Sequence, residues 1–298
     1  MRTRKTLPLT LCPHVLYERP VNKGCVFSPA LGVNLIGRRT YARLVKELLH
    51  ELADEVAKAV GSFEGDAGAI MGTGAYGTPT QAIDRIAEEA VLRYLAYNDS
   101  NLNVLSEEAG FVDRGGSKTL ILDPIDGTYN AVRGVPLYST SMAVGKARLS
   151  TVSHGLVRHL ATGDTYYAEK GGGAFRNGKK IATRTYEPKD RLFSVYLGTQ
   201  AAPAAYRIAK GARRVRSLGS ASLDLCCVAS GAFDLYYMNS NAEARLRIMD
   251  IAAGVLLVRE AGGVVVETKQ KELDMAVDLK ARTNLVAAGD RRALEVLA

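Results

Sequence analysis

The second half of the chain alternates between strand-like and helix-like segments, and this alternation restricts the fold more than any other feature. Short runs rich in β-branched and aromatic residues predict strands, and apolar residues at helical spacing between them predict helices. The predicted strands are 192–197, 214–217, 233–238 and 263–267, and the predicted helices are 203–210, 220–230 and 251–261. Such alternation is typical of a sheet covered by helices. We therefore predict an α/β domain over residues 190–298.

The first half shows a different pattern, which predicts an α+β domain over residues 37–189. Apolar residues that recur every four positions indicate an amphipathic helix over 40–60, namely Leu44, Leu48, Leu52, Val56 and Val60. Short strands are expected at 103–106, 119–123, 139–144 and 154–160, and Asn177-Gly178 predicts a hairpin turn between strands at 166–168 and 180–182. No repeat or flexible linker separates the two halves, so we expect them to pack as one unit.

A second helix is expected where the sequence carries a capping signal. Thr78 is suited to the N-cap, Pro79 to the first helical position and Gln81 to the reciprocal capping contact. Asp84 would then lie one turn into this helix. Residues 1–36 have neither helical nor strand periodicity, and we interpret them as an extension outside the fold.

The net charge of +8 suggests nucleic-acid binding until its location is considered. Residues 1–43 hold eight basic side chains and one acidic side chain, Glu18, so the rest of the chain is nearly neutral. No apolar run is long enough to span a membrane. The four cysteines have no CxxC spacing, and the adjacent Cys226 and Cys227 are unsuited to a stable bridge. We therefore expect a cytoplasmic protein that binds neither nucleic acid nor membrane.

Two segments imitate nucleotide-binding motifs without their context. Gly72-x-Gly74-x-x-Gly77 lacks a preceding β-branched strand, which argues against a dinucleotide site. Gly173-x-x-x-x-Gly178-Lys179 is followed by Lys180 instead of the Ser or Thr that a P-loop needs for Mg²⁺. Both are interpreted as ordinary glycine-containing turns.

An acidic hexapeptide at the end of an apolar strand is the strongest chemical signal. Asp123-Pro124-Ile125-Asp126-Gly127-Thr128 places two carboxylates three residues apart, followed by a glycine turn and a hydroxyl. Hard divalent cations prefer oxygen ligands, and free backbone N–H groups in a turn suit phosphate. Glu107 and Asp250 also stand at predicted element ends, and each alone would be interpreted as a solvated acid or a helix cap. Their occurrence together favours a metal and phosphate site.

These motifs resemble those of the inositol monophosphatase family of Mg²⁺-dependent phosphatases. The resemblance covers residues 38–298 and includes Asp123–Asn130, Ser106–Glu108 and Asp250–Gly254. Gly127–Gly134 and Gly77–Thr80 are most similar to the archaeal branch, which hydrolyses inositol phosphates and fructose 1,6-bisphosphate. The family's usual Trp before the last metal Asp is Met249 here, a position that flanks the ligand. The resemblance implies a layered αβαβα sandwich of mixed α/β class and a homodimer.

The resemblance also implies roles for individual residues. Two to three Mg²⁺ ions would be held by carboxylates and one backbone oxygen, from Asp84, Glu107, Asp123, Ile125, Asp126 and Asp250. Asp84, Glu107 and Thr128 would orient and deprotonate the attacking water. Gly127 and Thr128 would receive the phosphate through their N–H groups. Because the ligands must be ionised, activity should fall in acid.

Further substrate contacts are expected from the second half. Gly219-Ser220-Ala221 matches a segment at a helix start that meets substrate in relatives, although Ser220 also suits an ordinary N-cap. Glu243 has the spacing of a ring-contacting glutamate in some relatives. Arg245 and Arg247 lie close to Asp250, where they would receive a second phosphate or form a solvated charged stretch. The histidines have no zinc-ligand spacing.

The functional hypothesis is a Mg²⁺-dependent phosphomonoester hydrolase acting on inositol 1-phosphate, fructose 1,6-bisphosphate or both. A 3′-phosphoadenosine 5′-phosphate phosphatase is the alternative within the same class, and Tyr129-Asn130 argues against it. A non-catalytic binding protein is the alternative from another class, which the complete set of expected ligands disfavours. The sequence does not rank the first two substrates.

Overall fold

The structure, a computed structural model, describes residues 37–75, 77–241 and 244–297. The predicted extension over 1–36 and the predicted substrate contact Glu243 therefore lie outside the described residues. Within the described part, no helix is both long and apolar enough to cross a membrane.

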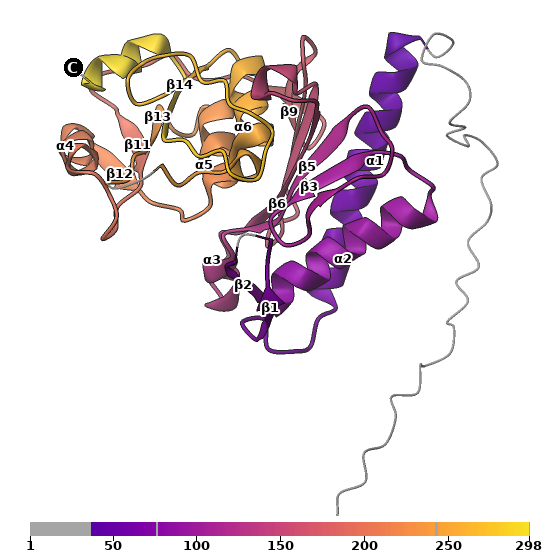
Figure 1. Cartoon of the computed structure of the whole chain (residues 1–298). Coiled ribbons are helices and arrows are strands. Elements are labelled where there is room, and N and C mark those ends of the chain that lie inside the picture. The colour runs from indigo at the N-terminus through magenta and orange to yellow at the C-terminus, as the bar shows by residue number, and fades with distance from the viewer. Residues whose placement is uncertain (1–36, 76, 242–243, 298) are drawn as a thin grey trace, which may run out of the picture.

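The molecule is a stack of five layers, alternately helical and β (Figure 1). The α-helices are α1 (Arg38–Gly61), α2 (Ala82–Tyr97), α3 (Thr128–Val132), α4 (Pro203–Gly211), α5 (Ala221–Ala229) and α6 (Ile248–Glu260). Two short 3-10 helices are η1 (Leu149–Thr151) and η2 (Arg291–Leu297). Helices α1 and α2 form one outer layer, α5 and α6 fill the middle between the two large sheets, and α4 with η2 covers the far side. The expected mixed α/β layered fold is confirmed.

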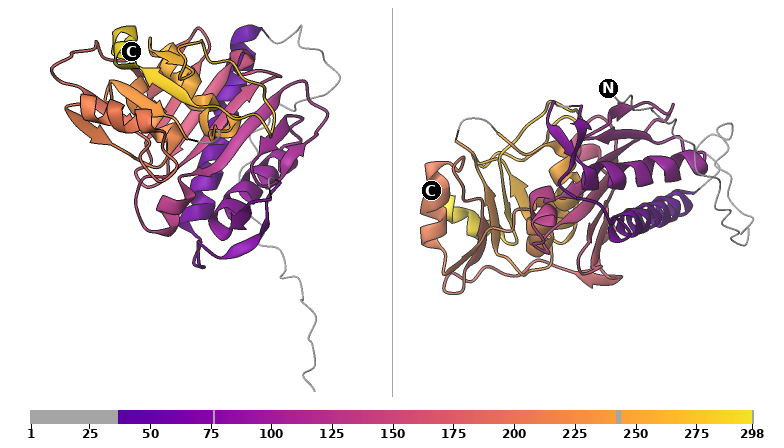
Figure 2. Two further views of the ribbon diagram at one scale, coloured as in Figure 1. Left: turned by 60° about the vertical axis from the view of Figure 1, so that its left-hand side comes forward. Right: turned by 90° about the horizontal axis from the view of Figure 1, so that it is seen from below.

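The larger sheet is built from the first half of the chain. Its strand order is β10-β9-β8-β7-β6-β5-β3-β4, and the strands are β3 (Asn103–Ser106), β4 (Gly110–Val112), β5 (Thr119–Asp126), β6 (Ser139–Gly145), β7 (His154–His159), β8 (Thr165–Glu169), β9 (Gly173–Arg176) and β10 (Lys179–Ile181). Only β3 and β5 pair in parallel. Seen from below, α1 and α2 lie side by side against one face of this sheet (Figure 2).

The smaller sheet is built from the second half. Its order is β12-β11-β13-β15-β14, with β11 (Leu192–Val195), β12 (Arg214–Arg216), β13 (Leu235–Met238), β14 (Val264–Val266) and β15 (Leu285–Ala288). Strands β12, β11 and β13 are parallel, and β15 is antiparallel to its two neighbours. A separate hairpin of β1 (Ile70–Thr73) and β2 (Pro79–Gln81) lies near the N-terminal end of α2.

Three apolar clusters fill the spaces between the layers. One lies between α1, α2 and the large sheet, the second surrounds α5 and α6, and the third lies between the small sheet and its outer helices. Gly254 allows α6 to approach α5 closely, because a Cβ atom there would lie 2.5 Å from a Leu225 side-chain carbon. The middle layer thereby joins the two halves, because α5 and α6 contact strands of both large sheets.

The predicted strands and helices of the second half are present with small shifts at their ends, whereas β15 was not predicted. Asn177 and Gly178 form the hairpin turn with φ angles of 50° and 75°, but they join β9 to β10, and the predicted strand at 166–168 belongs to β8. The predicted helix start at Thr78 is wrong. Pro79–Gln81 pair with β1 instead, and α2 begins at Ala82 without a side-chain cap.

The reason for this correction is tertiary. The hydroxyl of Thr80 donates a hydrogen bond to the carboxylate of Glu108, and the N–H of Gly74 donates to Thr78 O at 2.9 Å. These contacts hold the segment extended, so the local capping signal is overridden. Asp84 still lies in the first turn of α2, where a carboxylate is favoured by the helix dipole.

Candidate active site

A cavity of about 270 Å³ lies where the two halves meet. Its walls include the end of β5, the turn before α5 and the start of α6. Most of the predicted site residues line it, namely Glu107, Asp123, Ile125, Asp126, Gly127, Thr128, Gly219, Ser220, Ala221, Arg247 and Asp250. Residues separated by more than a hundred positions are thus brought to one cavity.

The geometry of the acidic hexapeptide follows from how β5 ends. The ladder with β6 is irregular between Asp123, opposite Ser141, and Asp126, opposite Ser139. Gly127 then takes φ 88° and ψ 35°, the left-handed region that favours glycine. A Cβ atom there would lie 2.9 Å from Leu137 O, so the turn also needs the missing side chain. The result is a sharp turn that leads directly into α3.

Asp126 is held by the N-terminal end of α5. Its Oδ2 accepts hydrogen bonds from Ser220 Oγ and Ser222 N, both at 2.7 Å, while Oδ1 accepts from Ala221 N at 3.3 Å. Ser220 is the N-cap of this helix and accepts from Leu223 N at 3.4 Å. The expected N-cap role of Ser220 is therefore confirmed. Asp126 fixes α5 and thus the position of Gly219–Ala221 on the cavity wall.

Arg247 connects two acids of the site. Its guanidinium forms an ion pair with Glu107, and its Nη2 and Nε lie 3.0 and 3.1 Å from Asp250 Oδ1. The backbone N–H of Arg247 donates to Asp250 Oδ2 at 2.8 Å. Glu107 follows β3 in the first half, whereas Asp250 belongs to α6. The side chain of Arg247 therefore lies among the acids of the cavity.

Burial and mutual repulsion dominate the electrostatics of these acids. The pKa of Asp123, which is only 2% exposed, is raised well above its ordinary value by burial and by Asp126, Asp250 and Glu107. Burial also raises the pKa of Asp126 to about 6, against the lowering effect of its hydrogen bonds from Ser222 and Ser220. A cluster of buried carboxylates of this kind is stabilised by a bound cation.

The donor set fits a hard divalent cation, because its side-chain ligands are carboxylate oxygens. Within the described residues, no three His, Cys, Asp or Glu side chains are gathered closely enough to hold an ion as they stand. The proposed ligands have other partners in this structure. Arg247 bridges Glu107 and Asp250, and the carboxylate of Asp126 is bonded to the start of α5.

Asp84 and Thr128 form a hydrogen-bonded pair beside the cavity. Thr128 Oγ1 lies 2.9 Å from Asp84 Oδ1 and 2.8 Å from Ile125 O, and it can donate to either. Burial raises the pKa of Asp84 to about 7, reinforced by Glu108 and Glu107 and opposed by the bond from Thr128. A carboxyl with this pKa can exchange a proton near neutral pH.

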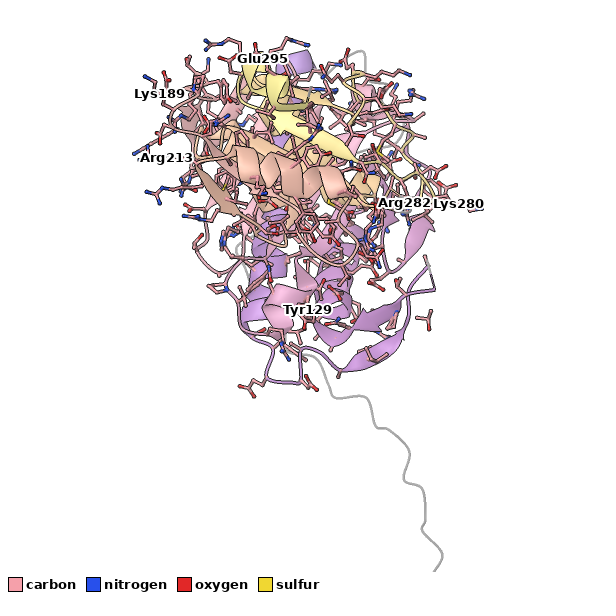
Figure 3. All side chains as sticks on the ribbon, turned by 90° about the vertical axis from the view of Figure 1, so that its left-hand side faces the viewer. Tyr129, Lys189, Arg213, Lys280, Arg282 and Glu295 are labelled. Atoms are coloured by element: carbon pink, nitrogen blue, oxygen red, sulfur yellow. The ribbon has the colours of Figure 1, made fainter. Side chains whose placement is uncertain are left out.

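Arg245 differs in position from most of the other predicted site residues. Its side chain is exposed and does not line the cavity. Leu246, next to it, forms an antiparallel bridge with Thr283, so Arg247 is opposite Arg282 in register. Figure 3 shows Arg282 and Lys280 on one flank of the C-terminal half, with Tyr129 below it on α3. Arg245 is therefore an exposed neighbour of the Leu246–Thr283 bridge, and Leu246 and Arg247 beside it line the cavity.

The sequence analysis missed several polar residues that support the site. Asn130 Nδ2 donates to Leu137 O at 2.7 Å and to Leu218 O at 2.8 Å, which ties α3 to the segment before α5. Glu88 is buried behind Glu107, where it accepts from Ser106 Oγ and from Ala109 N at 3.0 Å. Asp224, inside an apolar run, bonds Ser194 Oγ at 2.6 Å. An acid within an apolar run is the sequence signal that identifies such residues.

Known proteins with similar sequences identify the family of this chain. The sequence model of the inositol monophosphatase family matches residues 41–298. The fructose-1,6-bisphosphatase/inositol-1-monophosphatase of Methanothermobacter thermautotrophicus is 40% identical over 255 residues, which cover 80% of this chain and 90% of that protein. The bifunctional NADP phosphatase/NAD kinase of Methanocaldococcus jannaschii is 35% identical over 280 residues, which cover 83% of this chain and 48% of that protein.

Solved structures agree as well. A crystal structure of an inositol monophosphatase–fructose 1,6-bisphosphatase has a TM-score of 0.75 at 28% identity, covering 85% of this chain and 97% of that chain. The IMPase of Thermotoga maritima has a TM-score of 0.69 at 27% identity, covering 86% and 96% respectively. Fold and sequence together define a phosphatase. The chain belongs to the inositol monophosphatase family, whose members generally depend on a metal ion, typically Mg²⁺.

Proposed function

We propose that this phosphatase hydrolyses the phosphate monoester of inositol 1-phosphate, of fructose 1,6-bisphosphate or of both. The observation that carries the proposal is the meeting of Glu107, Asp123, Asp126 and Asp250 around one cavity beside the Gly127–Thr128 turn. Four acids would repel an anionic substrate, so the cavity suits phosphate only when divalent cations are bound there. The names of the relatives supply the two substrates.

We assign the metal ligands as the sequence motifs imply. Glu107, Asp123 and the backbone oxygen of Ile125 would hold one Mg²⁺, and Asp123, Asp126 and Asp250 would hold a second. Asp84 and Glu107 would hold a third, weaker ion through water. Bound Mg²⁺ would supply a more acidic water and neutralise charge on the phosphate and the leaving oxygen.

The protein's own groups then position the reactants. The 2.9 Å contact between Thr128 Oγ1 and Asp84 Oδ1 supports a role for this pair, with Glu107, in orienting the attacking water and accepting its proton. The amides of Gly127 and Thr128 would hold the phosphate. Gly219, Ser220 and Ala221 would contact the rest of the substrate from the start of α5, with Glu243 as a further contact.

A second phosphate would meet Arg245, two residues before the cavity-lining Arg247. Arg245 is exposed beside the bridge that sets Arg247 opposite Arg282, so its guanidinium can accept an anion without leaving a buried partner. This arrangement favours a bisphosphate among the two proposed substrates. The homodimer and the cytoplasmic location expected from the sequence remain part of the proposal.

A second candidate substrate is NADP, whose 2′-phosphate is also a monoester. The observation in its favour is the similarity to bifunctional NADP phosphatase/NAD kinases at 32% and 35% identity, of which this chain covers 47% and 48%. Like fructose 1,6-bisphosphate, NADP carries additional phosphate charge that Arg245 would meet.

The test is phosphate release with Mg²⁺ from inositol 1-phosphate, fructose 1,6-bisphosphate, NADP and 3′-phosphoadenosine 5′-phosphate. We expect the highest kcat/KM for one of the first two. A preference for NADP would favour the second candidate, and a preference for 3′-phosphoadenosine 5′-phosphate would contradict both. No release from any of the four would refute the proposed substrate class.

A further inference from the structure

Among the described residues that line the cavity, Arg247 is the only Lys or Arg. Its side chain is 20% exposed, and the chain holds it from both sides by Glu107 of the first half and Asp250 of the second. The acids it contacts are two of the proposed metal ligands. A guanidinium in this position compensates the repulsion among Glu107, Asp123, Asp126 and Asp250.

The same carboxylate oxygens cannot serve the guanidinium and a divalent cation equally well. Asp250 Oδ1 accepts from both Nε and Nη2 of Arg247, at 3.1 and 3.0 Å, and the ion pair with Glu107 occupies another oxygen of the proposed set. A divalent cation beside the guanidinium would experience direct charge repulsion in a largely buried site. The two cations are therefore alternatives.

We propose that Arg247 is an exchangeable counter-ion, which a divalent metal displaces from Glu107 and Asp250 and which then binds the phosphate of the substrate. The inference rests on the proposed function, because it uses the same metal ligands. The main chain at Arg247 is held separately from the guanidinium, because Arg247 N donates to Asp250 Oδ2 at 2.8 Å. The exchange therefore needs a movement of the side chain alone. Arginine also suits a phosphate oxygen pair as well as it suits a carboxylate.

This arrangement couples the metal and the anion. The metal must overcome the ion pairs of Arg247, and phosphate stabilises the displaced guanidinium. Phosphate should therefore tighten metal binding, and metal should tighten phosphate binding by the same factor. Arg247 thus adjusts metal affinity to the presence of substrate.

The test is calorimetric titration of Mg²⁺ into the full chain, with and without inorganic phosphate, for the wild type, Arg247→Met and Arg247→Lys. We expect Arg247→Met to bind Mg²⁺ at least tenfold more tightly than the wild type without phosphate. Phosphate should tighten Mg²⁺ binding in the wild type and in Arg247→Lys, but little in Arg247→Met. The matched control is Arg259→Met, near the other end of α6, where the guanidinium donates to Leu273 O and no proposed metal ligand is near.

Thermal melting supplies a readout that does not depend on hydrolysis. In EDTA, Arg247→Met should melt below the wild type because its acids lose their counter-ion, and saturating Mg²⁺ should remove most of this difference. Unchanged or weaker Mg²⁺ binding by a folded Arg247→Met would overturn the exchange while leaving the proposed function intact. Absence of Mg²⁺ binding by the wild type, with phosphate as without it, would overturn both.

Discussion

Asp123 is an acid of the cavity whose ionised form is disfavoured by its surroundings. It is buried, and Asp126, Asp250 and Glu107 all raise its pKa in addition to the effect of burial. As a proposed metal ligand, Asp123 would bind the metal at the expense of stability in the metal-free protein.

Replacement of Asp123 by Asn should therefore separate activity from stability. Mutation of groups that merely support metal ligands costs about 10–100-fold, so loss of a proposed ligand should lower phosphate release by at least about 100-fold. In EDTA, Asp123→Asn should melt at or above the wild-type temperature because one repelling charge is removed. The control is Asp274→Asn, which breaks a surface ion pair with Arg148 and should keep full activity. An active Asp123→Asn would contradict the assignment.

The exposed Arg245 gives a prediction about substrate choice. If it meets the second phosphate, Arg245→Met removes a charged hydrogen bond worth about 1.5–3 kcal/mol and should raise the KM for fructose 1,6-bisphosphate about tenfold or more. The KM for inositol 1-phosphate should stay unchanged because that substrate has no second phosphate. Arg207→Met, an exposed change on α4, is the control. Equal effects on both substrates would argue against this contact.

At the residue scale, the separation of the site residues along the sequence determined which of them could be predicted. Asp123, Asp126, Gly127 and Thr128 are contiguous, so one turn brings them to the cavity and the motif is sufficient. The ion pair of Arg247 with Glu107 joins segments that are distant in sequence, and neither sequence interpretation of Arg247, a contact to a second phosphate or a solvated charged stretch, included it. Asn130 was similarly unforeseen, because its partner Leu218 is supplied by the second half.

At the element scale, the turn between β5 and α3 depends on Gly127. Gly127→Ala places a Cβ atom 2.9 Å from Leu137 O at φ 88°, so we expect a loss of about 1–3 kcal/mol and at least a tenfold drop in kcat as Thr128 shifts. Gly134→Ala is the matched control, because φ is 70° there but no atom lies within 4 Å of the new Cβ. Chemical denaturation and phosphate release measure the two effects. Equal losses of activity would contradict the proposed role of the turn.

The face of the large sheet below α1 carries a buried histidine. Burial, with a contribution from Lys118, lowers the pKa of His154 to about 4. The unfolded chain has a histidine pKa of about 6.5, so between these values the unfolded state binds a proton that the folded state does not. Stability contributed by neutral His154 is therefore present above pH 6.5 and is lost as the pH falls towards 4.

We expect His154→Gln to be less sensitive to acid than the wild type. Between pH 7 and 4.5, the melting temperature of the wild type should fall by on the order of 5–10 °C more than that of the variant. Other groups titrate in this range in both proteins, so the difference between them isolates His154. Parallel melting curves across this range would show that His154 does not contribute.

Element prediction succeeded where tertiary contacts agree with local preference. The apolar stripe of α1 is formed as predicted, and Asn177-Gly178 makes the predicted turn, although the strand before it is β9 and not the predicted 166–168. The capping signal at Thr78 failed because Thr80 bonds Glu108 and the segment pairs with β1. The residues around Thr80 do not indicate Glu108 as a partner, because Glu108 lies 28 residues further along the chain.

At the scale of the whole molecule, the five layers explain why the active site needs both halves. Strand β5 presents two acids, while α5 and α6 lie against the large sheet and bring Ser220 and Asp250 to the same cavity. The alternation of strands and helices predicted the second half as an α/β unit. It did not predict that α5 and α6 would also cover the large sheet, because that packing depends on surfaces from both halves.

The central claim is that the acidic cavity hydrolyses a phosphate monoester only with divalent metal bound. Its most direct test is the rate of phosphate release from fructose 1,6-bisphosphate and inositol 1-phosphate by the wild-type chain as Mg²⁺ is titrated after EDTA treatment. We predict no release above background in EDTA and a saturable rise with Mg²⁺ for at least one substrate. Release that is equally fast in EDTA, or absent at every Mg²⁺ concentration for both substrates, would contradict it.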